Sequence, residues 1–261
     1  MKVKGTCEER FLEVKKLFND LHESDREVGS SFAVYKDGKA IIDLWGGYTD
    51  KDHTDEWCRD TLATVWSTTK GIAAITLAYA HQNGLLDYEE KVSKYWPEFG
   101  CNGKEEITVG MLLSHQAGIC GSSTNKVEDY YDQKIMADEL ANMTPIWEPG
   151  TASGYHSLTY GWLTSELIIR VTGKSLGQYF KDEIADPNDI DFYIGLPEIE
   201  EHRVAEMIPF SKEANEKNHH PNDAQKASGK GPNLLKHQNS RKWRAAEIPS
   251  ANGQGLSLIH I

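Results

Sequence analysis

Two Ser-x-x-Lys pairs in this chain could supply a nucleophile together with a base. They are Ser67-Thr-Thr-Lys70 and Ser123-Thr-Asn-Lys126. On a helix, residues three apart share a face, so an unprotonated lysine amine can take the proton of the serine hydroxyl. Chance produces a pair or two in a chain of this composition, so the surroundings of each pair must decide between them.

The surroundings favour Ser67 and Lys70. They open an expected helix over 67–83 whose apolar positions include Ile72, Ile75 and Leu77. The first backbone N–H groups of a helix lack intrahelical partners, so they would be available close to Ser67. Burial lowers the pKa of a lysine, and a general base at neutral pH needs such a lowered pKa. The alternative is that Ser67 is only an N-cap and Lys70 a solvated residue. The second pair lies in a polar loop.

A tyrosine forms the second candidate group. Pro149-Gly-Thr-Ala-Ser-Gly-Tyr155-His-Ser157 is a turn that places Tyr155 just before an expected helix over 158–172. A lysine ammonium lowers the pKa of a neighbouring phenol, which can then act as a base. The alternative is a core aromatic at a helix start.

Other signatures are absent or weak. The chain has no H-E-x-x-H helix and no Walker A loop. Gly173-Lys-Ser175-Leu-Gly177 matches G-x-S-x-G, but it follows a helix instead of a strand, so Ser175 is interpreted as an N-cap. His219-His220 has no apparent third ligand. We therefore expect no metal and no cofactor.

The elements that must position these groups are a helix, a hairpin and two longer helices. Apolar spacing predicts a helix over 8–22, and two apolar runs around Asp37-Gly38 predict a β-hairpin over 31–45. Residues 211–244 carry eight basic and three acidic residues, a net charge of +5, with little apolar periodicity. We expect this segment to be a basic surface excursion: a solvated loop, or else a substrate-facing flap or a basic docking patch.

Composition narrows the class of protein. The 261 residues have a formal net charge of −12 and are 39% hydrophobic, which fits a packed core and a single domain over 1–255. The acidic balance disfavours nucleic-acid and membrane partners. No apolar segment suits a transmembrane helix or a secretory signal, and the four cysteines form no C-x-x-C pair. We expect a cytoplasmic protein with reduced thiols.

Together these motifs resemble the serine β-lactamase and penicillin-binding-protein superfamily, in its class C-related branch that includes the family VIII carboxylesterases. The matching stretches are Ser67 to Gly71, Leu112-Leu-Ser-His115-Gln-Ala-Gly118, Glu148-Pro-Gly150 through Ser157, and the hairpin ending in Trp45-Gly-Gly47. The resemblance covers about residues 8–255. It implies an α/β (α+β) fold, in which an antiparallel sheet flanked by helices is joined by a helical domain.

The resemblance also implies roles. Ser67 would be the nucleophile, Lys70 its base, and Tyr155 the group that moves a proton to the leaving group. Ser157 stands where such β-lactamases usually carry Asn, which favours esters over β-lactams; Ser157 and Trp66 are expected to contact substrate. In this family His115 lies in a structural loop, although a histidine beside a serine could also indicate a triad.

The resulting prediction is a serine hydrolase that forms an acyl-enzyme with small carboxylic esters or amides. The alternatives are a β-lactamase or D-amino-acid peptidase on the same scaffold, and a non-catalytic binding or scaffold protein. A fluorophosphonate labelling gel with ester, cephalosporin and peptide turnover assays would separate them.

The end of the chain departs from the family pattern. A third motif, Lys-Thr-Gly or a variant, is expected on a strand after Tyr155, and none is found there. Residues 249–255 resemble the start of a helix. Residues 256–261 are what a transposase-adaptor end would encode, so we expect a non-native tail. We therefore expect a C-terminally truncated sheet that lacks one oxyanion donor, a poorly soluble and nearly inactive 261-residue chain, and an active full-length gene product.

Overall fold

A β-hairpin begins the architecture, and its turn is set by two residues. In the computed structural model, β2 (Gly29–Lys36) and β3 (Lys39–Gly47) pair antiparallel around Asp37 and Gly38, whose φ angles are +52° and +73°. Two successive left-handed residues are what a two-residue hairpin turn of type I′ requires. The hairpin predicted from the sequence is confirmed.

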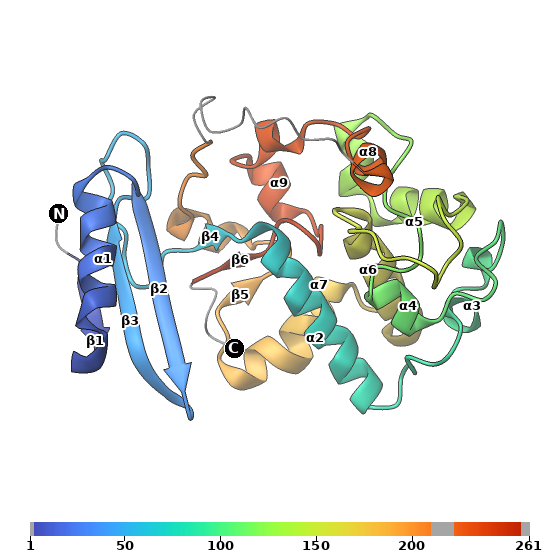
Figure 1. Ribbon diagram of the computed structural model, residues 1–261, viewed down its shortest axis with the longest axis horizontal. Helices are drawn as coiled ribbons and strands as arrows, with labels where there is room; N and C mark the ends of the chain where they lie inside the picture. The colour runs from blue at the N-terminus through green and yellow to red at the C-terminus, as the bar shows by residue number, and fades with distance from the viewer. Residues whose placement is uncertain (1–2, 210–221, 257–261) are drawn as a thin grey trace. The chain divides into compact units, whose positions relative to one another are not determined.

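A third strand and a helix complete this sheet. The short strand β1 (Lys4–Cys7) pairs antiparallel with β3, giving the order β1-β3-β2. The predicted first helix is present as a 3₁₀ turn, η1 (Glu9–Phe11), followed by α1 (Leu12–Glu23). α1 covers one face of the sheet, where Phe18 is buried in a cluster with Ile42 and Leu44 (Figure 1).

Contacts within the chain group its residues into two compact units. The structure describes residues 3–209 and 222–256. Of these residues, one unit, here the sheet unit, comprises 3–65, 197–209 and 254–256; the other, the helical unit, comprises 66–196 and 222–253. The sheet unit also holds η7 (Glu198–Arg203) and a strand pair of β4 (Ala63–Thr64) with β6 (Gln254–Gly255).

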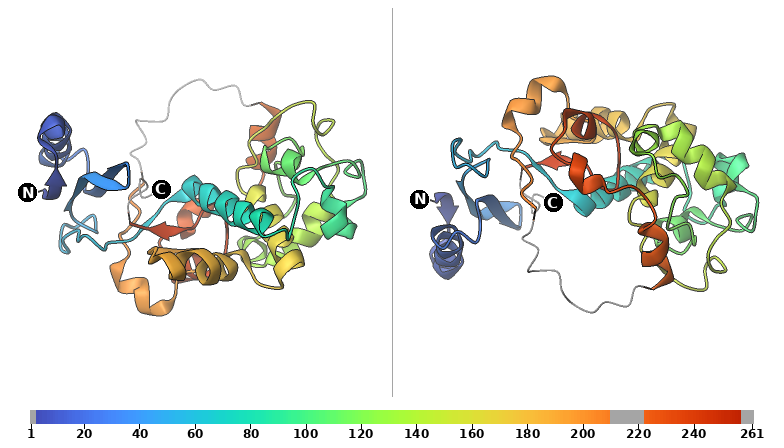
Figure 2. Two further views of the ribbon diagram at one scale, coloured as in Figure 1. Left: turned by 90° about the horizontal axis from the view of Figure 1, so that it is seen from below. Right: turned by 90° about the horizontal axis from the view of Figure 1, so that it is seen from above.

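The helical unit is organised around α2 (Thr69–Gln82), which packs against α6 (Thr159–Thr172) and α7 (Leu176–Phe180) (Figure 2). α6 ends at Gly173 with a φ of +74°, the left-handed C-cap expected from the sequence. The core of this unit buries large side chains from along the whole unit, among them Leu77, Trp96, Phe99, Leu112, Trp162 and Trp243. This packing holds the start of α2 and the start of α6 in one rigid frame.

The remaining elements of the helical unit are short. They are η2 (Trp66–Thr68), α3 (Val92–Tyr95), η3 (Pro97–Phe99), α4 (Val109–Leu113), η4 (Val127–Tyr131), α5 (Gln133–Asn142), the π-helical turn η5 (Lys181–Ala185), η6 (Asp186–Asn188), β5 (Phe192–Tyr193), α8 (Asp223–Ser228), η9 (Leu234–His237) and α9 (Arg241–Ala245). None of the helices in the described ranges is long and apolar enough to cross a bilayer.

The structure describes part of the expected surface excursion, and it corrects the expectation of a helix start at residues 249–255. Residues 222–244 of the expected surface excursion form α8, η9 and α9, and they bury Leu234 and Trp243. Isolated apolar anchors without periodicity hid this packing from the sequence. Residues 249–253 form a turn and a non-helical link, followed by β6, instead of the expected helix start. Residues 210–221 and 257–261, and with them His219-His220 and nearly all of the expected tail, lie outside the described residues.

Candidate active site

Ser67 and Lys70 meet at the entrance of α2. Ser67 lies in the 3₁₀ turn η2 and Lys70 is the second residue of α2, so the helix begins two residues later than predicted. Residues three apart eclipse each other in a 3₁₀ turn. This places Lys70 Nζ 3.1 Å from Ser67 Oγ, within hydrogen-bond distance.

The turn that carries Ser67 is strained and anchored. Trp66 has a φ of +46°, which is rare for a bulky residue and costs roughly 1–3 kcal/mol. Thr69 is fully buried and offsets this strain: its Oγ1 donates to Trp66 O at 2.5 Å and accepts from Gly253 N at 2.9 Å. Any side chain at Gly253 would come within 2.8 Å of Thr69 Oγ1, so the close approach requires glycine there.

Lys70 is a buried amine with a second partner. Its side chain is 8% exposed, and Nζ donates to the backbone carbonyl of Ser250 at 2.7 Å. Burial disfavours the ammonium and lowers the pKa of Lys70 to about 8. About one tenth of the amine is therefore unprotonated at pH 7, far more than a solvated lysine would provide.

The loop that supplies the Ser250 carbonyl is closed by one side chain, Asn252. This residue is fully buried; its Nδ2 donates to Trp243 O at 2.6 Å and to Ala246 O at 2.7 Å, and its Oδ1 accepts from Ile248 N at 2.9 Å. The sequence did not identify Ser250 or Asn252 as site residues, because a backbone carbonyl leaves no residue-type signature. A buried asparagine between Ile248 and Gly253 is the signal that could have indicated the loop.

Tyr155 reaches the same serine from the other side. Its hydroxyl donates to Ser67 Oγ at 2.6 Å, and Lys70 Nζ lies 4.9 Å from the centre of its ring. Its side chain is 48% exposed, so a bound molecule can reach the phenol. The structure therefore brings together all three residues that the sequence predicts as catalytic.

Two histidines hold Tyr155 in place. His156 is fully buried: Nε2 accepts from Ile119 N at 3.1 Å and Nδ1 lies 2.7 Å from Gly154 O, so the ring is neutral with its proton on Nδ1. Burial lowers its pKa to about 4. His115 Nδ1 accepts from His156 N at 3.2 Å, and its ring centre lies 5.2 Å from that of Tyr155.

His115 is thus placed behind the tyrosine. Among the described residues it makes no hydrogen bond to Ser67. Burial, and secondarily the nearby charge of Lys70, lowers its pKa. This geometry agrees with the structural-loop interpretation of His115 and does not form a serine–histidine pair.

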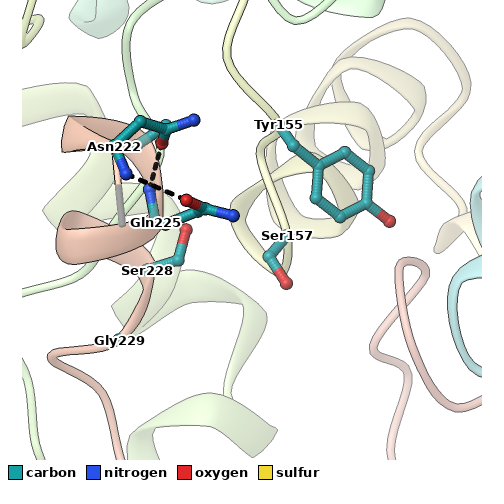
Figure 3. Close-up of a pocket in the computed structure, with 7 residues that line it drawn as sticks. Tyr155, Ser157, Asn222, Gln225, Ser228 and Gly229 are labelled. Carbon is teal, nitrogen blue, oxygen red and sulfur yellow. Dashed lines mark hydrogen bonds between the residues drawn. The ribbon is translucent and has the colours of Figure 1, made fainter. Parts of the chain in front are cut away.

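The two expected substrate contacts have different surroundings. Ser157 and Tyr155 line one side of a cavity of about 380 Å³, and α8 with its flanking residues lines the other side (Figure 3). That volume is within the range of small-molecule sites. Trp66 is not among the residues lining this cavity; its ring packs 5.5 Å from that of Trp243.

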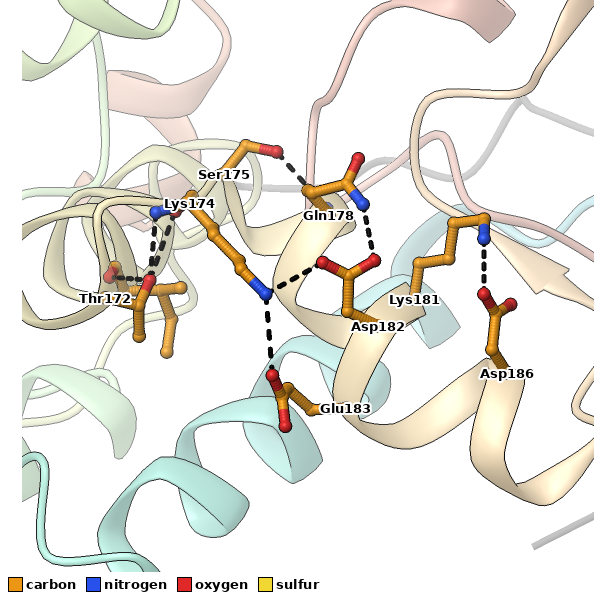
Figure 4. A network of polar contacts seen from close by, with 9 residues as sticks. Thr172, Lys174, Ser175, Gln178, Lys181, Asp182, Glu183 and Asp186 are labelled. Carbon is orange, nitrogen blue, oxygen red and sulfur yellow. Dashed lines mark hydrogen bonds and ion pairs between the residues drawn. The ribbon is translucent and has the colours of Figure 1, made fainter.

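The G-x-S-x-G serine is an N-cap, as the sequence predicts. Ser175 Oγ accepts from Gln178 N at 3.2 Å and donates to Glu247 at 2.6 Å, while Lys174 pairs with Asp182 and Glu183 (Figure 4). Ser123 likewise donates to Glu139 at 2.8 Å.

Within residues 3–209 and 222–256 no three His, Cys, Asp or Glu side chains could hold a metal ion.

We expect Ser175→Ala to lower stability without changing the chemistry. Loss of an N-cap serine costs about 0.5–2 kcal/mol of unfolding free energy, and the partly buried Glu247 carboxyl also loses a donor. Urea denaturation would measure the loss, and fluorophosphonate labelling would be unchanged. A folded Ser175→Ala variant that no longer takes up the probe would contradict this assignment.

Solved structures share the fold of the whole described chain. A family VIII carboxylesterase is similar with a TM-score of 0.88 and 42% identity, covering 98% of this chain and 68% of that one. A penicillin-binding-protein homologue from Caulobacter crescentus has a TM-score of 0.89 and 34% identity, covering 99% of this chain and 69% of that one. These likenesses confirm the predicted class, a β-lactamase/transpeptidase-like fold of antiparallel sheet and helices.

The family follows from the sequence match. The model of the Beta-lactamase family matches residues 14–255, and the chain belongs to that family. A curated relative is the esterase/beta-lactamase LipL of Mycobacterium tuberculosis, 38% identical over 209 residues, which are 79% of this chain and 48% of LipL. The chain thus spans about half the length of that relative. The resemblance inferred from the motifs is confirmed.

Proposed function

We propose that the protein is a serine hydrolase that cleaves small carboxylic esters through an acyl-enzyme intermediate. One observation carries this proposal: Ser67 Oγ lies 3.1 Å from the amine of Lys70 and 2.6 Å from the phenol of Tyr155. A hydroxyl between a buried amine and a phenol has both a base and a proton donor within reach. The family match and the similarity to a carboxylesterase support the same reaction class.

The residues divide the reaction into two steps. In the first, the neutral amine of Lys70 takes the proton of Ser67, Oγ bonds to the ester carbonyl carbon, and the alkoxide leaves with a proton from Tyr155. In the second, water loses a proton to the Tyr155 phenolate and attacks the acyl-enzyme, and Ser67 leaves with the proton held by the Lys70 ammonium. The two steps together return Ser67, Lys70 and Tyr155 to their starting protonation states. The water consumed is the only co-reactant.

Ser157, which follows Tyr155 and His156 in the same turn, favours esters over β-lactams as substrates. Ser157 occupies the position where related β-lactamases carry Asn, so the amide that would bind a lactam side chain is missing. A β-lactamase or D-amino-acid peptidase is the second candidate, favoured by the 34% identity to a penicillin-binding-protein homologue.

A turnover panel tests the proposal. The protein is assayed with p-nitrophenyl acetate, a chromogenic cephalosporin and a D-Ala-D-Ala peptide, before and after fluorophosphonate treatment. We expect the ester to be the best substrate by kcat/KM and the probe to abolish its turnover. Cephalosporin or peptide turnover exceeding that of the ester would favour the second candidate, and no turnover of any of the three would overturn the proposal.

Tyr155→Phe separates chemistry from packing, because it keeps the ring and removes only the hydroxyl. A positioned acid–base group contributes about 10²–10⁴-fold in rate, so kcat should fall by about a hundredfold or more. The melting temperature should change little, since the phenol is exposed and its bond to Ser67 lies at the surface. A fall in kcat of less than about threefold, or a comparable loss of stability, would mark Tyr155 as a packing residue.

Asn252→Ala tests whether the closed loop tunes the base. Without its amide, the loop no longer holds the Ser250 carbonyl against Lys70. A hydrogen bond to a charged group contributes about 1.5–3 kcal/mol, so the ammonium loses stabilisation and its pKa falls by about one unit or more. The pH–rate profile of the folded variant should shift to lower pH. A mere loss of folded protein would scale the rate equally at every pH and leave the midpoint unchanged.

A further inference from the structure

One carboxylate ties the segment after α9 to the start of α7. Glu247 Oε1 accepts from Ser175 Oγ at 2.6 Å, and Glu247 Oε2 accepts from Gly177 N at 2.8 Å. Each oxygen of the carboxylate therefore has a donor of its own. The two donors lie 72 and 70 residues earlier in the chain, so these bonds join segments that are distant in sequence.

Two glycines leave the room that this side chain occupies. A Cβ at Gly177 would lie 2.8 Å from Glu247 Cδ, and a Cβ at Gly195 would lie 3.0 Å from Glu247 Cγ. Gly195 also has a φ of +82°, which residues with a side chain rarely adopt. A carboxylate that is enclosed in this way and bonded through both oxygens has little freedom to move.

Glu247 stands three residues before the carbonyl that accepts from Lys70. The residues between them are Ile248, which is fully buried, and Pro249, whose ring fixes its φ. Ser250 is fully buried as well. Because so short and enclosed a link has few ways to absorb a displacement, a movement of Glu247 is passed on to the carbonyl of Ser250.

The shape of this loop and its place in the helical unit are set by different bonds. Asn252 closes the loop on its own backbone, which fixes its shape. Bonds to other elements fix its place: Ser250 Oγ donates to the carbonyl of Leu158, just before α6, at 2.8 Å. Glu247 supplies the corresponding anchor at α7.

We propose that Glu247 is a positioning residue for the general base, because it anchors the loop whose Ser250 carbonyl accepts from Lys70. The inference deepens the proposed hydrolysis and rests on it for the role of Lys70 as the base. Without the anchor, the carbonyl leaves its place and the Lys70 ammonium loses an acceptor. The pKa of Lys70 then falls, since a hydrogen bond to the charged form no longer stabilises it.

An NMR titration measures this effect directly on Lys70. The protein is labelled with ¹³C at the lysine Cε atoms, and the Lys70 resonance is assigned by its absence in Lys70→Met. Glu247→Met nearly keeps the length of the side chain and removes both acceptors. We expect it to lower the titration midpoint of Lys70 by about half a pH unit or more, a part of what complete loss of the hydrogen bond would cause.

Two further substitutions of Glu247 separate position from charge. In Glu247→Gln the amide oxygen can accept from Gly177 N and the amide nitrogen can donate to Ser175 Oγ, so both contacts survive without the charge. This variant should keep the wild-type midpoint. Glu247→Asp keeps the charge but is one methylene shorter, so it should move the midpoint in the same direction as Glu247→Met. It serves as the milder variant if Glu247→Met does not fold.

Asp132→Ala is the matched control for a general loss of stability. Asp132 Oδ1 accepts from Ile135 N at 3.0 Å and caps the start of α5. Its removal, like that of Glu247, takes a carboxylate from the start of a helix in the same unit. The melting temperature should fall, and the midpoint of Lys70 should stay unchanged.

Each result supports or overturns the proposal. An unchanged midpoint or a shift to higher pH in folded Glu247→Met, or in Glu247→Asp in its place, would overturn it. So would a shift of equal size in Glu247→Gln or in Asp132→Ala. The titration does not depend on turnover, so failure to hydrolyse any ester would contradict the proposed function and leave the anchoring by Glu247 tested. If an ester is hydrolysed, the pH dependence of kcat/KM should move with the NMR midpoint.

Discussion

Ser67→Ala should abolish both covalent labelling by a fluorophosphonate probe and ester turnover. Removal of the nucleophile of a serine hydrolase lowers kcat by about 10⁴–10⁶-fold. The expectation follows from geometry: Ser67 Oγ lies within hydrogen-bond distance of both Lys70 and Tyr155. Mass spectrometry of the labelled wild-type protein should place the adduct on the peptide that contains Ser67.

The chain offers a matched control in its second Ser-x-x-Lys pair. Ser123 is engaged by the Glu139 carboxylate, so Ser123→Ala should label and turn over like the wild type. Stoichiometric labelling of Ser67→Ala would contradict the assignment. The modified peptide would then identify the true nucleophile.

Lys70→Met should lower kcat/KM by about 10²–10⁴-fold, the contribution of a positioned general base. Methionine nearly preserves the length of the side chain and removes the amine. Lys126→Met, in the second pair, should have no effect. If kcat/KM for p-nitrophenyl acetate fell by less than tenfold, Lys70 would be a structural residue and not the general base.

The pH dependence of the wild-type protein gives an independent check on Lys70. Its pKa is lowered to about 8 by burial. Below that pH the side chain is an ammonium and cannot accept the serine proton; above it, the neutral amine can. At pH 7 about one tenth of the molecules hold the active form, so kcat/KM should rise with pH through about 8 and then level off. The Lys70→Met variant should not show this rise of kcat/KM with pH.

Local patterns predicted the elements that carry the candidate catalytic residues. The helix expected over 67–83 is α2 with its preceding 3₁₀ turn, and the helix expected over 158–172 is α6. Both have an apolar face over several turns and a glycine beyond the end, signals that reside in contiguous sequence. The Asp37-Gly38 hairpin is equally local. That Ser67, Lys70 and Tyr155 converge was implied by the family resemblance, because local patterns place each residue on its element but do not bring the elements together.

Features that depend on distant pairing were not predictable in this way. β1 contains Gly5 and only one apolar residue, Cys7, so it has no strand pattern of its own and exists through its pairing with β3. The carbonyl of Ser250 reaches Lys70 only because Asn252 closes a loop on three backbone groups. The capping box at the start of α8 is local, but the position of α8 across the cavity from Ser157 is a tertiary feature.

The bond between Lys70 and the Ser250 carbonyl spans 180 residues of sequence. During synthesis at about 5–20 residues per second, roughly 9–36 s separate the addition of the two residues. Throughout that interval Ser67 and Lys70 have been synthesised but the residue that supplies the carbonyl has not, so this hydrogen bond cannot yet form. The arrangement of Lys70 seen in the folded protein is therefore completed late, after the end of the helical unit has been synthesised.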